Sequence, residues 1–411
     1  MKIEAVRAWE ILDSRGDPTI EVQVKLAGGI TGNAKVPSGA STGKHEAHEL
    51  RDGDSHRYGG KGVLRAVQNV VDVLGPALRG EDAADQRRID ARMIDLDGTP
   101  NKSRLGANAI LGISCAVARA AANQLGIPLW RHLQDGRRAS IPVPMVNILS
   151  GGLHATGDFE FQDFLAIPRG FASLAAALEA IAAVHGAAKK LLMERGCILT
   201  GVADEGGWGP HLRSNEIALQ ILAEAIERSG HPMDIAIDVA SSHFHAGGIY
   251  TLASEDRTLT AGELIELLAG WSERYPVVSI EDGLTEDDWD GWRMLTARLG
   301  SRVQLIGDDL FCTNPERLER GIREGAANAV LVKMNQIGTI TEAMAVVDRA
   351  REAGYRAVIS ARSGETEDDF LADLAVASGA GQIKVGSITR SERLAKYNRL
   401  LAIENSGLAA T

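Results

Sequence analysis

Cysteine is scarce in this sequence, and long apolar runs are absent. The three cysteines, Cys115, Cys197 and Cys312, are an odd number at wide spacing and form no Cys-x-x-Cys pair. This pattern argues against a disulfide framework and a thiolate metal site, and it indicates a reducing, cytoplasmic compartment. No apolar run reaches the roughly 18 residues that span a bilayer, and the stretch MKIEAVRAWEILDSRG lacks the apolar core of a signal peptide. We therefore expect neither export nor a membrane anchor.

Positive charge is also in deficit. Lysine and arginine together number 44 against 55 aspartates and glutamates, which gives a net charge of −11. A protein with this balance does not attract nucleic acid or anionic lipid electrostatically, so we expect neither as a partner. The 411 residues exceed one ordinary domain. They suit a small domain followed by a barrel of about 250 residues.

The C-terminal half contains a series of apolar runs that each end in a polar residue able to do chemistry. Their centres lie roughly 20 to 40 residues apart, which leaves room for a helix between neighbouring strands. This rhythm predicts a closed α/β barrel, whose chemistry lies at the C-terminal ends of the strands. The polar residues that we expect to converge there are Asp238, Glu281, Asp308, Lys333, Arg362 and Lys384.

The N-terminal part follows a different pattern. Alternating stretches at residues 3–12, 19–26 and 32–36 precede helical patterns, which predicts an α+β domain over residues 1–132. The segment QDGRRASIPVP combines charge, glycine and two prolines that cannot continue a helix, so it marks a boundary. We expect the barrel to occupy residues 141–411.

Three acids at the ends of successive predicted strands are the strongest local signal. Mg²⁺ prefers oxygen ligands in octahedral geometry, and Asp238, Glu281 and Asp308 supply such ligands. Because successive strand residues face opposite sides, the adjoining Asp282 and Asp309 are expected to orient neighbours instead. The alternative is that these acids only cap the helices that follow.

Two lysines accompany the acids. Next to a metal ion the proton affinity of an ammonium falls, so Lys333 is a candidate base. Lys384 is expected to neutralise negative charge on a substrate or an enolate. The structural alternative is a lysine that is simply paired to a core acid.

The whole chain, from end to end, resembles the enolase family. The motifs that carry the likeness are SRGDPTIEV, VPSGASTG, ELRDGD, LGANAILG, DEGGWGP, SIEDG, GDDLFCTN, VKMNQIGT, RSGETED and SERLAKYN. The resemblance implies an N-terminal α+β domain, an enolase-type (β/α)8 barrel with a ββαα start, two Mg²⁺ ions and usually a homodimer, or a larger assembly of dimers. The implied reaction interconverts 2-phosphoglycerate and phosphoenolpyruvate, so the expected partner is a small phosphorylated or phosphonate carboxylate.

The resemblance also assigns roles to single residues. It gives Asp238, Glu281 and Asp308 to the first metal ion, and it gives Ser41, in a loop that closes over the substrate, to the second. An ordinary turn serine is the alternative for Ser41. Lys333 matches the base that removes the proton beside the substrate carboxylate.

Further matches concern the substrate's carboxylate, phosphate and hydroxyl. Lys384 matches the residue that meets the carboxylate, and Arg362 with Ser363 matches the phosphate clamp, which suits the fixed donor fork of arginine. Glu205 matches the acid that helps the β-hydroxyl depart, and His154 matches a mobile-loop histidine near the phosphate. Taken alone, each of these last two would more often be a satisfied structural residue.

The chain departs from the family pattern around the leaving hydroxyl. Ala361 replaces a histidine and Asp163 replaces a catalytic glutamate, which shortens that side chain by one methylene. Loss of one positioned proton donor costs about 10²- to 10⁴-fold. The other changes are Gly283 for proline, His243 for glutamate, and Ser387, Ile388 and Thr389 in the turn after Lys384.

These departures lead to three alternatives for function. The first is a specialised Mg²⁺-dependent enzyme that acts on the phosphoenolpyruvate skeleton, such as carboxyphosphonoenolpyruvate synthase of phosphonate biosynthesis. The second is a housekeeping enolase with compensated substitutions, in which His243 is one candidate replacement. The third is a non-catalytic binding protein of this fold, which predicts random decay of the metal ligands. We expect the first, because the enolate-forming residues remain and the residues around the hydroxyl have changed.

Overall fold

The computed structural model describes residues 1–39, 43–155 and 159–408. Its N-terminal domain contains a three-stranded antiparallel sheet and a long buried helix. The strands lie in the order β1-β2-β3, and the inward side chains of β2 are fully buried against α4. A Cβ atom on Gly32 would lie 2.3 Å from the backbone of Ala116 and Ala120, so glycine permits the close approach of β3 to α4. The elements are β1 (Ile3–Leu12), β2 (Pro18–Leu26), β3 (Thr31–Lys35), α1 (Leu64–Asn69), α2 (Gly75–Leu78), α3 (Gln86–Asp97), α4 (Ala107–Leu125) and α5 (Leu129–Leu133).

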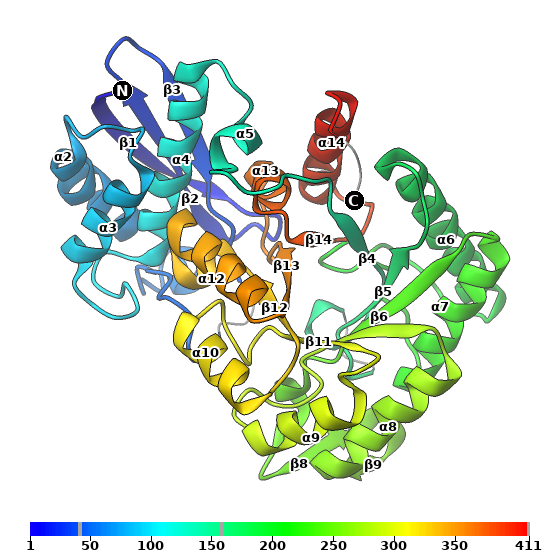
Figure 1. Cartoon of the computed structure of the whole chain (residues 1–411). Coiled ribbons are helices and arrows are strands. Elements are labelled where there is room, and N and C mark those ends of the chain that lie inside the picture. Colours follow the sequence, from blue (N-terminus) through cyan, green and yellow to red (C-terminus); the bar gives the residue numbers. More distant parts are fainter. Residues whose placement is uncertain (40–42, 156–158, 409–411) are drawn as a thin grey trace.

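The rest of the chain forms a closed eight-stranded barrel, which confirms the predicted α/β fold (Figure 1). Strand β5 runs antiparallel to both β4 and β6, whereas the other neighbouring pairs are parallel. Two strands and then two helices open the barrel, as the resemblance implies. Its strands are β4 (Val143–Ser150), β5 (Asp163–Pro168), β6 (Met233–Asp238), β10 (Val277–Glu281), β11 (Gln304–Gly307), β12 (Ala329–Val332), β13 (Arg356–Ser360) and β14 (Gly381–Gly386).

Helices surround the barrel, and α12 and α13 face the N-terminal domain (Figure 1). A small antiparallel sheet of β7 (His245–Ala246), β8 (Ile249–Leu252) and β9 (Arg257–Leu259) follows β6. Among the described residues, no helix is both long and apolar enough to cross a bilayer. The barrel helices are α6 (Leu174–Glu194), α7 (Asn215–Ser229), α8 (Ala261–Arg274), α9 (Trp289–Leu299), α10 (Pro315–Glu324), α11 (Met334–Ile337), α12 (Ile340–Glu352), α13 (Phe370–Ser378) and α14 (Ser391–Asn405).

Strand alternation separates the apolar interior of the barrel from its catalytic end. A distinct apolar cluster is drawn from alternate strand residues, including Ala236, Ile306 and Leu331. Residues two positions apart on a strand share a face. The side chains that follow on the same faces are Asp238, Asp308 and Lys333, so the apolar filling of the barrel gives way to charged groups at the C-terminal ends of these strands.

Candidate active site

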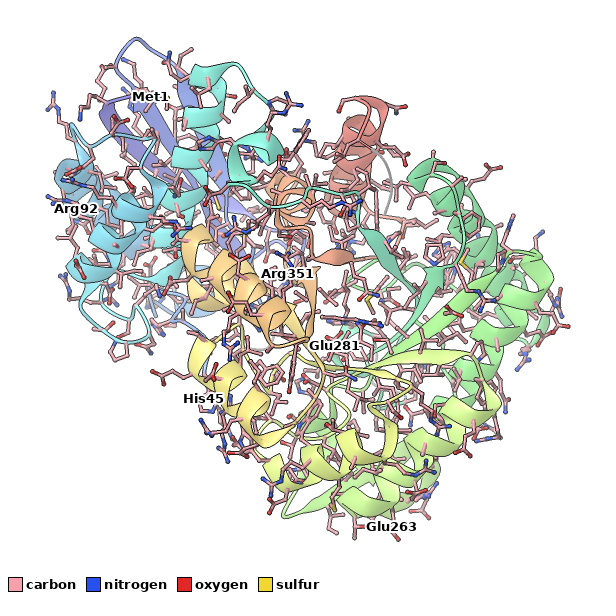
Figure 2. The ribbon with its side chains drawn as sticks, in the orientation of Figure 1. Met1, His45, Arg92, Glu263, Glu281 and Arg351 are labelled. Atoms are coloured by element: carbon pink, nitrogen blue, oxygen red, sulfur yellow. The ribbon has the colours of Figure 1, made fainter. Side chains whose placement is uncertain are left out.

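The residues expected at the strand ends come together. Asp238, Asp308, Lys333, Arg362 and Lys384 line one pocket, which confirms their predicted convergence. Glu281 is 2% exposed and is bonded to Lys384. Figure 2 shows Glu281 in the interior of the barrel, away from the outer surface of the molecule.

Lys384 bridges two of the predicted metal ligands. Its Nζ atom lies 2.7 Å from Asp238 Oδ2 and 2.7 Å from Glu281 Oε2. Burial lowers the pKa of a lysine, but the two carboxylates raise the pKa of Lys384 well above its usual value. Burial and the neighbouring Asp238 also raise the pKa of Glu281. The single positive charge of Lys384 therefore does not balance two ionised carboxylates, Asp238 and Glu281.

Lys333 pairs with the third acid. Its Nζ atom donates to Asp308 Oδ2, and Gln336 Nε2 donates to Asp308 Oδ1 at 3.0 Å. Burial alone would raise the pKa of Asp308, but Lys333 holds it below the usual value. Burial opposes charge on Lys333 as well, and Asp308 raises its pKa. Lys333 is thus held as an ammonium here.

The three acids do not act as helix caps. The side chains that cap the N-termini of α8, α9 and α10 belong to Thr260, Asp288 and Asn314. Asp282 instead accepts hydrogen bonds from the backbone N–H groups of Asp308 and Asp309 at 2.9 and 2.8 Å. Asp282 therefore orients the end of β11, as expected from strand alternation.

The donor set suits a hard divalent cation. The buried carboxylates of Asp238, Glu281 and Asp308 offer oxygen atoms, and Lys333 and Lys384 are the cations that now balance them. In the described part of the chain, the acid and histidine groups with ligand atoms within 4.8 Å of one another are His154–Asp163–Glu205 and Asp282–Asp308–Asp309. The predicted triad is not among these groups, and its acids are instead paired with Lys333 and Lys384. Binding of Mg²⁺ would exchange these ammonium partners for the ion.

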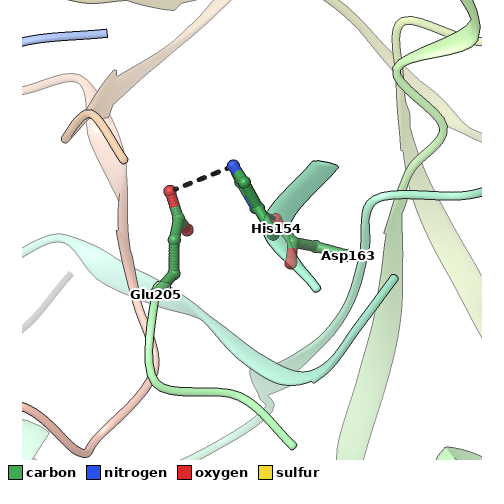
Figure 3. Close-up of side chains that lie close together, drawn as sticks. All are labelled: His154, Asp163 and Glu205. Carbon is green, nitrogen blue, oxygen red and sulfur yellow. Dashed lines mark hydrogen bonds and ion pairs between the residues drawn. The ribbon is translucent and has the colours of Figure 1, made fainter. Parts of the chain in front are cut away.

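A second cluster consists of His154, Asp163 and Glu205 (Figure 3), and two of its members, His154 and Glu205, line the same pocket. Asp163 Oδ2 lies 2.9 Å from His154 Nδ1, and Glu205 Oε1 lies 3.8 Å from His154 Nε2. Burial disfavours a charged imidazole, but the two carboxylates raise the pKa of His154 to about 9. The histidine is therefore cationic at neutral pH.

Asp163 occupies a different position from the one expected of a carboxylate that reaches the substrate. It is fully buried and does not line the pocket. Asn147 and Ser150 donate hydrogen bonds to its Oδ1 atom, while Oδ2 faces His154. The shorter side chain thus lies behind His154, in contact with the imidazole.

Not all of the remaining departures lie at this cavity: Gly283 does not line it, and a Cβ atom there would meet the apolar side chains of Leu295 and Leu268. Ala361 and His243 both line the pocket, and burial lowers the pKa of His243. The altered turn after Lys384 supports the Glu205 loop, since Ser387 N–H donates to the Glu205 carbonyl and Thr389 Oγ1 donates to the Gly206 carbonyl. This turn therefore positions Glu205.

The predicted phosphate clamp is rigidly built. Arg393 is completely buried, and its guanidinium donates to the backbone carbonyls of Arg362 and Ser363, each at 2.6 Å. Arg362 NH1 donates to Asn335 Oδ1 at 2.8 Å and pairs with Glu46 Oε2 at 3.1 Å. Ser41 lies outside the described residues.

Several site residues escaped the sequence analysis. Gln162 donates to Asp238 at 3.2 Å, Gln336 contacts Asp308, and Glu46 reaches Arg362 from the N-terminal domain. Gln162 adjoins Asp163, and Gln336 lies within the quoted VKMNQIGT motif. The sequence could therefore have drawn attention to Gln162 and Gln336. It could not have predicted their partners, which are distant in sequence.

The fold is that of a closed α/β barrel preceded by an α+β domain, and one end of the barrel gathers acidic and basic side chains around a pocket. Residues 138–410 match the family model described as "Enolase, C-terminal TIM barrel domain", and residues 3–133 match "Enolase, N-terminal domain". A protein named Enolase from Rubrobacter xylanophilus is 56% identical over 409 residues, which cover 98% of this chain and 95% of the relative. The chain belongs to the enolase family, whose members are Mg²⁺-dependent carbon–oxygen lyases.

Proposed function

We propose that this chain interconverts 2-phosphoglycerate and phosphoenolpyruvate as an ordinary enolase. The observation that carries the proposal is the convergence of Lys333 and Lys384 on three buried acids, at a pocket that His154 and Glu205 also line. The comparisons favour this alternative and give no support to the specialised phosphonate enzyme that we expected from Ala361. The retained acids and lysines also argue against a non-catalytic binding protein. The homodimer stays a prediction of the family resemblance.

In the proposed mechanism, Lys333 removes the proton and so forms the enolate. A bound Mg²⁺ ion at Asp238, Glu281 and Asp308 would supply Lewis-acid stabilisation of the developing enolate charge. Lys333 can accept the proton from the carbon beside the carboxylate only as the free amine. Asp308 raises the pKa of Lys333. A cation that neutralises Asp308 would therefore lower this pKa and favour the free amine. In this proposal Lys384 meets the substrate carboxylate.

In the proposed mechanism, Glu205 and His154 supply the proton that the departing hydroxyl needs. Ala361 carries no proton donor, but the imidazolium of His154 faces Glu205 and is held from behind by Asp163. Burial would raise the pKa of Glu205, but His154 and Arg393 hold it below the usual value, so Glu205 is a carboxylate. The proton for the departing hydroxyl therefore comes from the His154 imidazolium and passes through Glu205, which leaves a neutral imidazole and an ionised Glu205. In this proposal Asp163 is a positioning residue that fixes the histidine, and the cluster compensates for the missing donor at position 361.

The test is the absorbance of phosphoenolpyruvate formed from 2-phosphoglycerate in the presence of Mg²⁺. The natural protein should turn over at a rate typical of enzymes, on the order of 10 s⁻¹. The specialised alternative predicts a rate lower by about 10²-fold or more, because one donor is missing. Slow turnover by protein that demonstrably binds 2-phosphoglycerate would contradict our proposal.

The compensation by His154 makes a separate prediction. His154→Asn should lower kcat for phosphoenolpyruvate formation by about 10²- to 10⁴-fold, because the variant cannot resupply the proton. His243→Asn is the matched control, since this histidine lines the same pocket but burial favours its neutral form. We expect this control to keep most of its activity. If His243→Asn loses more activity than His154→Asn, His243 is the replacement donor instead.

A further inference from the structure

Glu46 is a buried carboxylate that enters the barrel site from the N-terminal domain. The side chains of Glu46 and Arg362 are 6% and 4% exposed. Arg362 NH1 lies 3.1 Å from Glu46 Oε2, and NH2 lies 3.3 Å from Oε1, so the pair is bidentate. This paired geometry is the one that arginine also offers to a phosphate group.

Two further contacts fix the carboxylate. Glu46 Oε1 accepts a hydrogen bond from the Gly43 backbone N–H at 2.9 Å and lies 3.4 Å from Gln336 Nε2. Gln336 in turn donates to Asp308, and its carbonyl accepts from Ala47 N–H at 2.7 Å. Glu46 thus connects the segment 43–47 both to Arg362 and to the neighbourhood of a predicted metal ligand.

A buried guanidinium without a counter-ion is costly, so Glu46 stabilises Arg362 when no phosphate is bound. A phosphoryl group bound through the same paired geometry would use the same two guanidinium nitrogens, and it carries the same sign of charge as Glu46. The two anions therefore compete for one arginine. Asn335, which is neutral and contacts NH1 at 2.8 Å, can remain in place during the exchange.

We propose that Glu46 is an internal competitor for the phosphate site and that it sets the affinity of the enzyme for the phosphoryl group of its substrate. The inference rests on the proposed function, since it takes Arg362 as the phosphate ligand. Binding energy of the phosphoryl group is offset in part by loss of the Glu46–Arg362 pair. Glu46 therefore weakens phosphate binding while it keeps the empty site ordered.

The test is calorimetric titration of inorganic phosphate, with Mg²⁺ present, into the natural protein and its variants. Glu46→Gln keeps the shape and an acceptor oxygen but removes the charge, so phosphate should bind about tenfold more tightly. In the turnover assay the KM for 2-phosphoglycerate should fall without a rise in kcat, because the phosphoryl group is held in both ground and transition states. Asp287→Asn is the control: it removes a half-exposed charge that pairs with Lys44 of the same segment, 3.0 Å away. Its phosphate affinity should stay within about twofold of natural, as expected for a weak surface pair.

The variant Arg362→Gln distinguishes failure of the phosphate clamp from failure of the competition by Glu46. If this variant binds phosphate like the natural protein, the phosphate clamp of the proposed function is wrong. If Arg362→Gln loses binding but Glu46→Gln binds phosphate no better than the natural protein, Glu46 is only a support and the competition is overturned. Glu46→Asp serves if Glu46→Gln does not fold. Its shorter reach should still tighten phosphate binding, by about threefold, and unchanged or weaker binding would overturn the inference.

Discussion

Lys333→Ala should abolish the formation of phosphoenolpyruvate, with kcat reduced by about 10⁴-fold, the upper end of what a positioned acid or base contributes. The substitution removes the proposed base and leaves Asp308 without its ammonium partner. Exchange of the C2 proton of 2-phosphoglycerate with D₂O, followed by NMR, should disappear as well, because this exchange needs only the first proton transfer.

Lys190→Ala is the matched control, since Lys190 is an exposed lysine on α6. It should keep natural exchange and turnover. Thermal unfolding of both variants shows whether the loss of activity reflects loss of fold. Proton exchange that survives in a folded Lys333→Ala protein would show that another group is the base.

Asp308→Asn should weaken Mg²⁺ binding by more than about 100-fold, because even the outer partners of metal ligands cost about 10- to 100-fold when they are replaced. Calorimetric titration of Mg²⁺ into the natural protein and the variant measures this directly. The amide keeps the shape of the side chain and can still accept from Gln336. The barrel core does not depend on the carboxylate, so the fold should persist.

Asp287→Asn again provides a control, since it removes a half-exposed carboxylate that pairs with Lys44 and leaves the three predicted ligands unchanged. Its Mg²⁺ affinity should equal that of the natural protein. Equal affinities in the natural protein and Asp308→Asn would remove Asp308 from the metal site.

The sequence predicted the barrel and the meeting of its strand-end residues because both depend on short-range periodicity. The two-residue alternation of a strand determines which side of it Asp238 or Lys333 faces. The spacing of the apolar runs leaves room for a helix between strands, which predicts that neighbouring strands are parallel. No knowledge of distant contacts is needed for either prediction. The assignment of Asp282 to a supporting role follows from the same rule.

The parts that the sequence could not predict depend on distant partners. Glu46 and Arg362 are 316 residues apart, and nothing in the local pattern around Glu46 marks it as buried beside a guanidinium. The surroundings of Asp163 could not be predicted for a similar reason, because its hydrogen bonds to Asn147 and Ser150 depend on the pairing of β4 with β5. The cluster of His154, Asp163 and Glu205, on which the proposed compensation for Ala361 depends, could not be predicted for the same reason.

The reversed direction of β5 has a consequence for how this site can vary. In a regular barrel each strand delivers its last residues to the catalytic end, and the chain then leaves through a helix. Here the chain turns back at the catalytic end itself, so the first residue of β5, Asp163, lies there between Ser150 of β4 and Asp238 of β6. His154 and the residues that hold Asp163 beside it, Asn147 and Ser150, thus all belong to a single hairpin. Exchange of that hairpin between relatives would transfer the histidine together with its supports, whereas Glu205, which follows α6, would stay with the rest of the barrel.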